Sequence, residues 1–141
     1  MHVTRGLLAV VVLVVVACGE DGSGHPTELD VSMFNTYFEP TDGTFQVGVP
    51  IEIMVTNAAP EGAQLSVHDF TVLAGLYETE ADVQQALRND PGLLVATTEL
   101  MAPGDSKTLN VTFEQAGVYQ FVCTVPDHLG AGMTGTITVQ G

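Results

Sequence analysis

Strict alternation of apolar and polar side chains is the feature that most constrains the fold of this chain. Residues 50–57, 107–113 and 134–139 place Ile, Val, Leu or Phe at alternate positions. A period of two is typical of β-strands that bury one face. Turn-forming Gly, Pro and Asp residues punctuate the chain at a spacing that fits about seven or eight short strands. We therefore predict an all-β domain, a sandwich or a barrel, over residues 29–141.

One segment, residues 79–89, breaks this pattern. Val83 and Leu87 have helical spacing, and Thr79 with Asp82 three residues later resembles a capping box. Asn, Asp, Pro and Gly in succession then end the segment. We predict a short helix inserted between strands and expect it to cover a sheet edge; recognition of a partner is the alternative.

The amino-terminal segment predicts export. Arg5 precedes an apolar run at residues 7–16, which is short for a membrane-spanning helix of about 20 residues. A small residue precedes Cys18, and residues 15–18 resemble a bacterial lipobox, whose Cys is lipidated. We therefore predict a lipoprotein signal peptide over residues 1–17. An uncleaved amino-terminal anchor and ordinary secretion are the alternatives.

The polar, Gly-rich stretch that follows predicts a flexible tether. The predicted organisation is a signal peptide at 1–17, the lipidated Cys18 with its tether at 18–28, and a folded domain at 29–141. Lipid on Cys18 would anchor the domain to a bacterial membrane. We expect the domain on the extracytoplasmic side, either periplasmic or at the cell surface.

The charge balance excludes one class of partner and favours another. The formal net charge is −14, and loss of Arg5 with the signal would leave Arg88 and Lys107 against seventeen carboxylates, a net charge of −15. Nucleic-acid binding needs clustered Lys and Arg, so a nucleic-acid partner is excluded. The acidic surface would attract a basic protein. Solubility, or an acidic or high-salt habitat, explains the same composition equally well.

The chemistry-bearing residues gather after one predicted strand. Residues 118–123 alternate so that Cys123 lies on the core face, as the last residue before a loop rich in Gly and Pro. That loop holds His128 five residues later and Met133 five residues after that. If Cys18 carries lipid, Cys123 has no disulfide partner. A thiol, an imidazole and a thioether therefore lie together at the mouth of a β scaffold.

This set of side chains points to copper. Zinc seldom binds thioether, iron–sulfur clusters need more than one thiolate, and Mg²⁺ and Ca²⁺ prefer oxygen. One thiolate, two imidazoles and a long axial Met form a blue copper site. Of the other histidines, His2 lies in the signal and His25 in the tether, so His68 is the candidate for the second imidazole.

Three motifs resemble the cupredoxins, the blue copper electron carriers of the plastocyanin, azurin and auracyanin kind. They are His-Asp-Phe, Gly-x-Tyr-x-Phe-x-Cys and Cys-x4-His-x4-Met, at residues 68–70, 117–123 and 123–133. The resemblance covers residues 29–141 and implies a Greek-key β-sandwich of about eight strands with one type 1 copper ion. It also implies three equatorial ligands and a weak axial one, which are His68, Cys123, His128 and Met133.

The residue after the first ligand departs from the resembled family, many of whose members have Asn there. Asp69 can still accept hydrogen bonds, and we expect donors around Thr124 to tie the two ligand segments together. The resemblance further implies that His128 exposes an edge at the surface and serves as the electron port. A small apolar collar would surround it, formed by Leu129, Gly130 and Ala131.

These features predict a monomeric one-electron carrier that is not an enzyme. Its partner would be a basic redox protein such as a c-type cytochrome or an oxidase domain. A lipoprotein that binds and delivers copper is the alternative, although the scattered Met residues argue against it. A copper enzyme would need a second copper centre, and no spare His exists outside the signal and tether. The intact ligand set disfavours a metal-free structural module.

Overall fold

The alternating segments form strands, as predicted. They become β4 (Pro50–Asn57), β7 (Ser106–Thr112) and β9 (Thr134–Gln140). In β4, Ile51, Ile53 and Val55 are buried, and the residues between them, including Met54, face solvent. The computed structural model describes residues 26–141, so the predicted signal peptide and Cys18 lie outside the described residues, as does most of the predicted tether.

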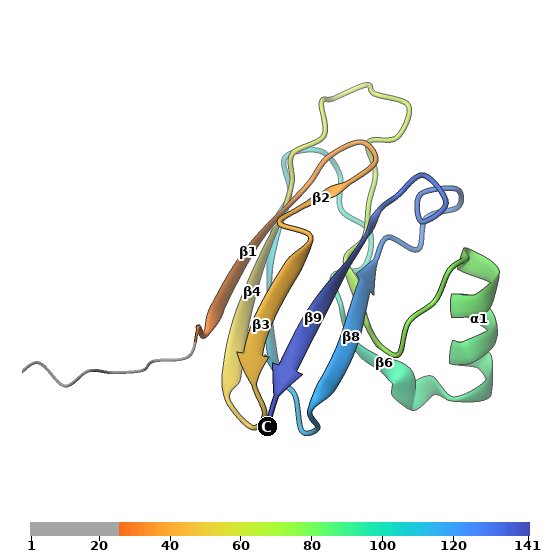
Figure 1. Ribbon diagram of the computed structural model, residues 1–141. Helices are drawn as coiled ribbons and strands as arrows, with labels where there is room; N and C mark the ends of the chain where they lie inside the picture. Colours follow the sequence, from red (N-terminus) through yellow and green to blue (C-terminus); the bar gives the residue numbers. More distant parts are fainter. Residues whose placement is uncertain (1–25) are drawn as a thin grey trace, which may run out of the picture.

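The described residues form two facing sheets (Figure 1). The remaining strands are β1 (Glu28–Met33), β2 (Phe38–Glu39), β3 (Asp42–Gln46), β5 (Thr71–Ala74), β6 (Leu94–Thr97) and β8 (Gly117–Val122). One sheet has the order β2-β1-β4-β7 and the other β3-β9-β8-β5-β6. The predicted Greek-key sandwich is confirmed, and the very short β2 contributes to a total of nine described strands rather than eight.

The core lies between the two sheets. Phe38 packs edge-on against Phe121 and Phe70, with ring centroids 5.2 Å and 5.6 Å apart. Gly135 of β9 makes room for Phe121, because a Cβ there would lie 2.1 Å from the ring. Cys123 is buried in this core and is the free cysteine of the described part of the chain. Packing, rather than a disulfide, holds these two sheets together.

The helix α1 (Glu80–Asn89) confirms the predicted helix and its capping box. The Thr79 hydroxyl accepts a hydrogen bond from the Asp82 N–H at 3.1 Å, and the Asp82 carboxylate accepts one from the Thr79 N–H at 3.2 Å. A short 3₁₀ helix, η1 (Pro91–Leu93), follows it. No helix within residues 26–141 is long and apolar enough to cross a membrane.

The expectation that this helix covers a sheet edge is wrong. Its Val83 belongs to a second apolar cluster, on the outer face of the sheet, with Leu73 of β5 and Val122 of β8. The physical reason lies in those two strands, which carry apolar residues on both faces. Because α1 covers the outer face here, Leu73 of β5 and Val122 of β8 are buried although they point away from the core between the sheets.

The chain enters the sandwich at the end opposite to the loop of residues 123–133 (Figure 1). β1 runs parallel to β4, from the Glu28–Glu52 pair to the Met33–Asn57 pair. The later pair lies towards the end that carries this loop. The start of β1 and the chemistry-bearing loop are therefore separated by the length of the sheet.

Candidate metal centre

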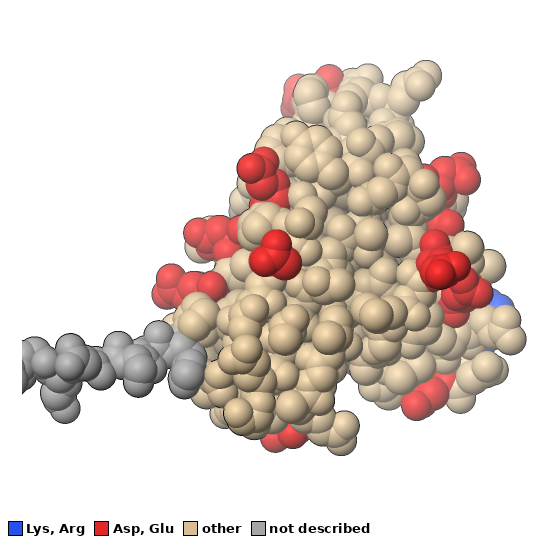
Figure 2. Space-filling model, in the orientation of Figure 1, with Lys and Arg blue, Asp and Glu red and all other residues tan. Residues whose placement is uncertain are grey.

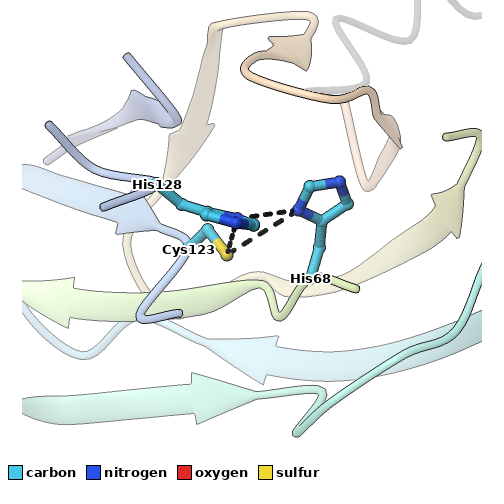
Figure 3. A group of neighbouring side chains, drawn as sticks. All are labelled: His68, Cys123 and His128. Atoms are coloured by element: carbon cyan, nitrogen blue, oxygen red, sulfur yellow. Dashed lines mark hydrogen bonds between the residues drawn. The ribbon is translucent and has the colours of Figure 1, made fainter. Parts of the chain in front are cut away.

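Three of the four predicted ligands meet at one point. The Nδ1 atoms of His68 and His128 lie 3.1 Å apart, and Cys123 Sγ lies 4.0 Å from the first and 3.4 Å from the second (Figure 3). A point equidistant from these atoms lies about 2 Å from each, and transition-metal bonds to imidazole nitrogen and thiolate sulfur are about 2.0–2.3 Å long. The donor set therefore fits one metal ion without rearrangement.

The centre is closed to solvent. His68 and Cys123 are fully buried, and His128 exposes only 3% of its surface, so the edge expected at the surface is nearly covered. Met133 is also fully buried, and its carbonyl accepts a hydrogen bond from the Cys123 N–H at 3.2 Å. The structure thus brings Met133 beside Cys123, while its role as axial ligand stays a prediction.

His68 is held between strands rather than within one. Its N–H and carbonyl pair with the backbone of Met101 in an isolated bridge, and β5 begins only at Thr71. The strand that follows His68 therefore begins three residues after it. The ladder is interrupted because the Phe70 N–H donates to the Thr98 hydroxyl instead of to a strand carbonyl.

His128 lies in a tightly turned loop between β8 and β9. Its N–H donates to the Val125 carbonyl at 3.1 Å, and its own carbonyl accepts from the Met133 N–H at 3.0 Å. Asp127 has a φ of 70°, a left-handed conformation that Asp tolerates better than most residues. Because β8 and β9 pair directly, the loop is anchored at both ends.

Burial sets the protonation states that a metal would meet. It lowers the pKa of His68 to about 4, with the neighbouring His128 adding to the effect, and it also lowers the pKa of His128. Near pH 7 the imidazoles are neutral and their Nδ1 lone pairs are available. Burial raises the pKa of the Cys123 thiol to about 12, so a metal ion must displace its proton.

The expected link between the two ligand segments is present. The Asp69 carboxylate accepts hydrogen bonds from the Thr124 N–H at 2.6 Å and from the Thr124 hydroxyl at 2.9 Å. It also accepts one from the Thr71 hydroxyl at 2.5 Å. Its own N–H points at Cys123 Sγ, 3.5 Å away. The residue after His68 is therefore fastened to the residue after Cys123.

The expected collar around His128 is only partly present. Gly130 and Ala131 are exposed, but Leu129 is 6% exposed and packs in the cluster under α1 with Val83. Leu129 therefore belongs to the attachment of the helix and not to a surface around His128. The sequence interpretation missed this because it placed the helix at a sheet edge.

Two further residues fix the centre and were not predicted. The buried Asn57 amide donates to the carbonyls of Ser66 and Met101, at 2.7 Å and 2.9 Å, close to the first imidazole. The Glu80 carboxylate of α1 accepts a hydrogen bond from the Gly130 N–H at 3.1 Å. Asn57 carried a signal, because it is a polar residue at a core position of the alternation. Glu80 carried none, because its partner is fifty residues away.

Solved structures of auracyanins share this fold. The reduced auracyanin of Roseiflexus castenholzii matches with a TM-score of 0.71 over 84% of this chain and 100% of that one, at 26% identity. Auracyanin A of Chloroflexus aurantiacus, a "blue" copper protein, matches with a TM-score of 0.61 over 82% of this chain and 99% of that one, at 21% identity. These likenesses agree with the predicted sandwich.

Sequence comparisons agree with the geometry. The copper-resistant cuproprotein CopI of Pseudomonas aeruginosa is 46% identical over 41 residues, which are 29% of this chain and 23% of that protein. The match thus spans less than a quarter of that relative's length. The model of the copper binding proteins, plastocyanin/azurin family, matches residues 27–140. The chain therefore belongs to the plastocyanin/azurin family of copper-binding proteins, and one copper ion is its cofactor.

Proposed function

We propose that this protein is a membrane-tethered carrier of single electrons and not an enzyme, with a type 1 copper ion held by His68, Cys123, His128 and Met133. When bound, copper supplies a one-electron couple between its cupric and cuprous states. The preformed triangle of two Nδ1 atoms and one Sγ atom carries the proposal. A cage that needs little rearrangement favours fast electron transfer over ion exchange.

The chain keeps this geometry through attachments on both sides of the triangle. The backbone bridge holds His68, and the Asp69 carboxylate holds the residue after Cys123. The hydrogen bond from Gly130 to α1 holds the loop that carries His128. Because the donor residues are almost fully buried, water is excluded from them and has little to reorganise when the charge changes.

Copper titration of the purified protein tests the proposal. We expect one equivalent of Cu²⁺ to give an intense blue colour that a reductant bleaches with one electron per copper, and that an oxidant restores. Met133→Leu should change the spectrum, whereas Met54→Leu, at an exposed position of β4, should not. Colourless copper that a mild chelator removes at once would contradict an electron carrier.

Copper binding and delivery is the second candidate. The local match to a copper-resistant cuproprotein favours it. Delivery requires the ion to leave readily, and the buried donors argue for slow release. The two candidates separate in one comparison of rates: a carrier exchanges electrons much faster than it loses copper to a chelator, and a delivery protein does the reverse.

The tether is proposed from the sequence. Lipid on Cys18 supports an extracytoplasmic, membrane-anchored location, because two or more acyl chains anchor a protein stably. Cys18→Ser should release the protein from the membrane fraction or leave the precursor uncleaved. Lipid labelling of that variant at the wild-type level would contradict the tether.

The proposed partner is a basic redox protein, such as a c-type cytochrome or an oxidase domain, that meets a monomer of this chain. Figure 2 shows carboxylates spread over the visible face, with cationic atoms only at its right edge. Such a charge speeds encounter with a basic partner, and salt screens the effect. The association rate should fall as ionic strength rises, and a rate independent of salt would contradict the proposed steering.

A further inference from the structure

A buried carboxylate lies against the sulfur of the proposed copper ligand. Asp69 is 3% exposed, and its Oδ1 atom lies 3.3 Å from Cys123 Sγ. Its hydrogen-bond donors are the Cys123 thiol, the hydroxyl groups of Thr71 and Thr124, and the Thr124 N–H. All of these donors are neutral. They spread the negative charge of the carboxylate but do not cancel it.

The low exposure makes this charge effective. A charge in contact with a buried site is screened much less than one that faces water. Oxidation of the metal centre adds one positive charge to it. A fixed anion beside the sulfur therefore stabilises the oxidised state relative to the reduced state.

We propose that Asp69 is a positioning residue that also lowers the reduction potential of the copper centre, compared with an uncharged amide in the same place. The inference rests on the proposed function of the centre. It assigns two tasks to one side chain. The hydrogen bonds to Thr124 hold the segment after Cys123, and the negative charge favours the cupric state.

Asp69→Asn separates the two tasks. The amide has the shape of the carboxylate, and its oxygen can still accept from the Thr124 N–H, so the variant removes the charge and keeps that link. Asp127→Asn is the matched control. It removes the same charge next to His128, but from an exposed side chain whose charge water screens.

Redox titration of the copper-loaded protein tests the inference. Asp69→Asn should shift the equilibrium between cupric and cuprous states at least tenfold towards cuprous, which is a rise of about 59 mV for one electron. Asp127→Asn should shift it much less. Thermal unfolding of the metal-free protein supplies the second measurement: Asp69→Asn should unfold near the wild-type temperature, whereas Asp69→Ala, which lacks the link, should unfold lower.

Three results would overturn the inference while leaving a blue copper site in place. They are equal shifts in the two Asn variants, a shift of Asp69→Asn towards the cupric state, and a loss of stability in Asp69→Asn as large as in Asp69→Ala. In that last case the change in reduction potential would come from the lost hydrogen bonds to Thr124 rather than from the lost charge. A wild-type protein that forms no blue centre contradicts the proposed function itself, and the inference with it.

Discussion

The two ligand-bearing regions of this molecule are built in different ways. The segment around His68 is fixed from inside the sandwich, by a backbone bridge to Met101 and by the buried amide of Asn57. The loop from Cys123 to Met133 joins β8 to β9 and is held by its own turns and by hydrogen bonds to the Asp69 and Glu80 carboxylates. Damage to the first region should therefore cost fold stability, and damage to the second should cost copper retention.

The largest expected effect comes from the one atom that both regions surround. Cys123→Ser removes the thiolate, which a hydroxyl group cannot replace as a ligand. We expect complete loss of the blue colour, measured by absorption after addition of Cu²⁺. The metal-free variant should unfold cooperatively like the wild type, because Ser differs little in volume. A blue Cys123→Ser protein would show that the colour has another origin.

The next largest effect tests the segment around His68. Asn57→Ala leaves the carbonyls of Ser66 and Met101 without their side-chain donor. We expect the free energy of unfolding of the metal-free protein to fall by about 2–4 kcal/mol, because buried polar groups lose their partners. Urea denaturation measures this. Thr56→Ala, the adjacent β4 residue with an exposed hydroxyl hydrogen bond, is the control and should lose less than about 1 kcal/mol. Equal losses would contradict the assigned role of the buried Asn57 amide.

A smaller effect tests the loop from Cys123 to Met133. Glu80→Ala removes the acceptor of the Gly130 N–H and frees the ligand loop from α1. Copper should pass to a chelator roughly two- to fivefold faster, the effect of one exposed hydrogen bond, with little change in fold stability. Glu80→Gln keeps an acceptor oxygen and should restore most of the wild-type rate. Glu78→Ala, an exposed carboxylate nearby, should leave the rate unchanged; an equal acceleration there would assign the effect to charge alone.

The smallest expected effect is the number of protons that the two regions release when copper binds. The pKa of the Cys123 thiol is raised to about 12 and the pKa of His68 is lowered to about 4. At pH 7 the thiol therefore holds a proton and the imidazole does not. Binding of Cu²⁺ should release about one proton per ion, and the apparent affinity should rise about tenfold per pH unit between pH 7 and 9. Titration in weakly buffered solution measures the release. Release of about two protons would mean that an imidazole is protonated before binding.

Features set by local sequence patterns could be predicted, whereas contacts between distant segments could not. Strands such as β4 and the cap at Thr79 are local patterns, and both were predicted with nearly correct bounds. The meeting of His68, Cys123 and His128 was also predictable, because few metals accept Cys, His and Met together, while Met133 as a ligand stays a prediction. The attachment of Glu80 to Gly130 was not, because it joins distant segments whose contact depends on how α1 packs. The expectation that Leu129 lies in an exposed collar was wrong for the same reason, because its burial also depends on how α1 packs.

The parallel pairing of β1 with β4 also separates the predicted anchor from the metal centre. The chain enters at Glu28, and the six residues of β1 carry it roughly 20 Å along the sheet towards the end that bears the loop. A lipid attached upstream would hold the domain by the end away from the metal centre, and a flexible tether would leave the metal centre free to face the aqueous compartment. Soluble electron donors would then reach it directly. A membrane-embedded acceptor would be reached only after the domain rotates about its tether.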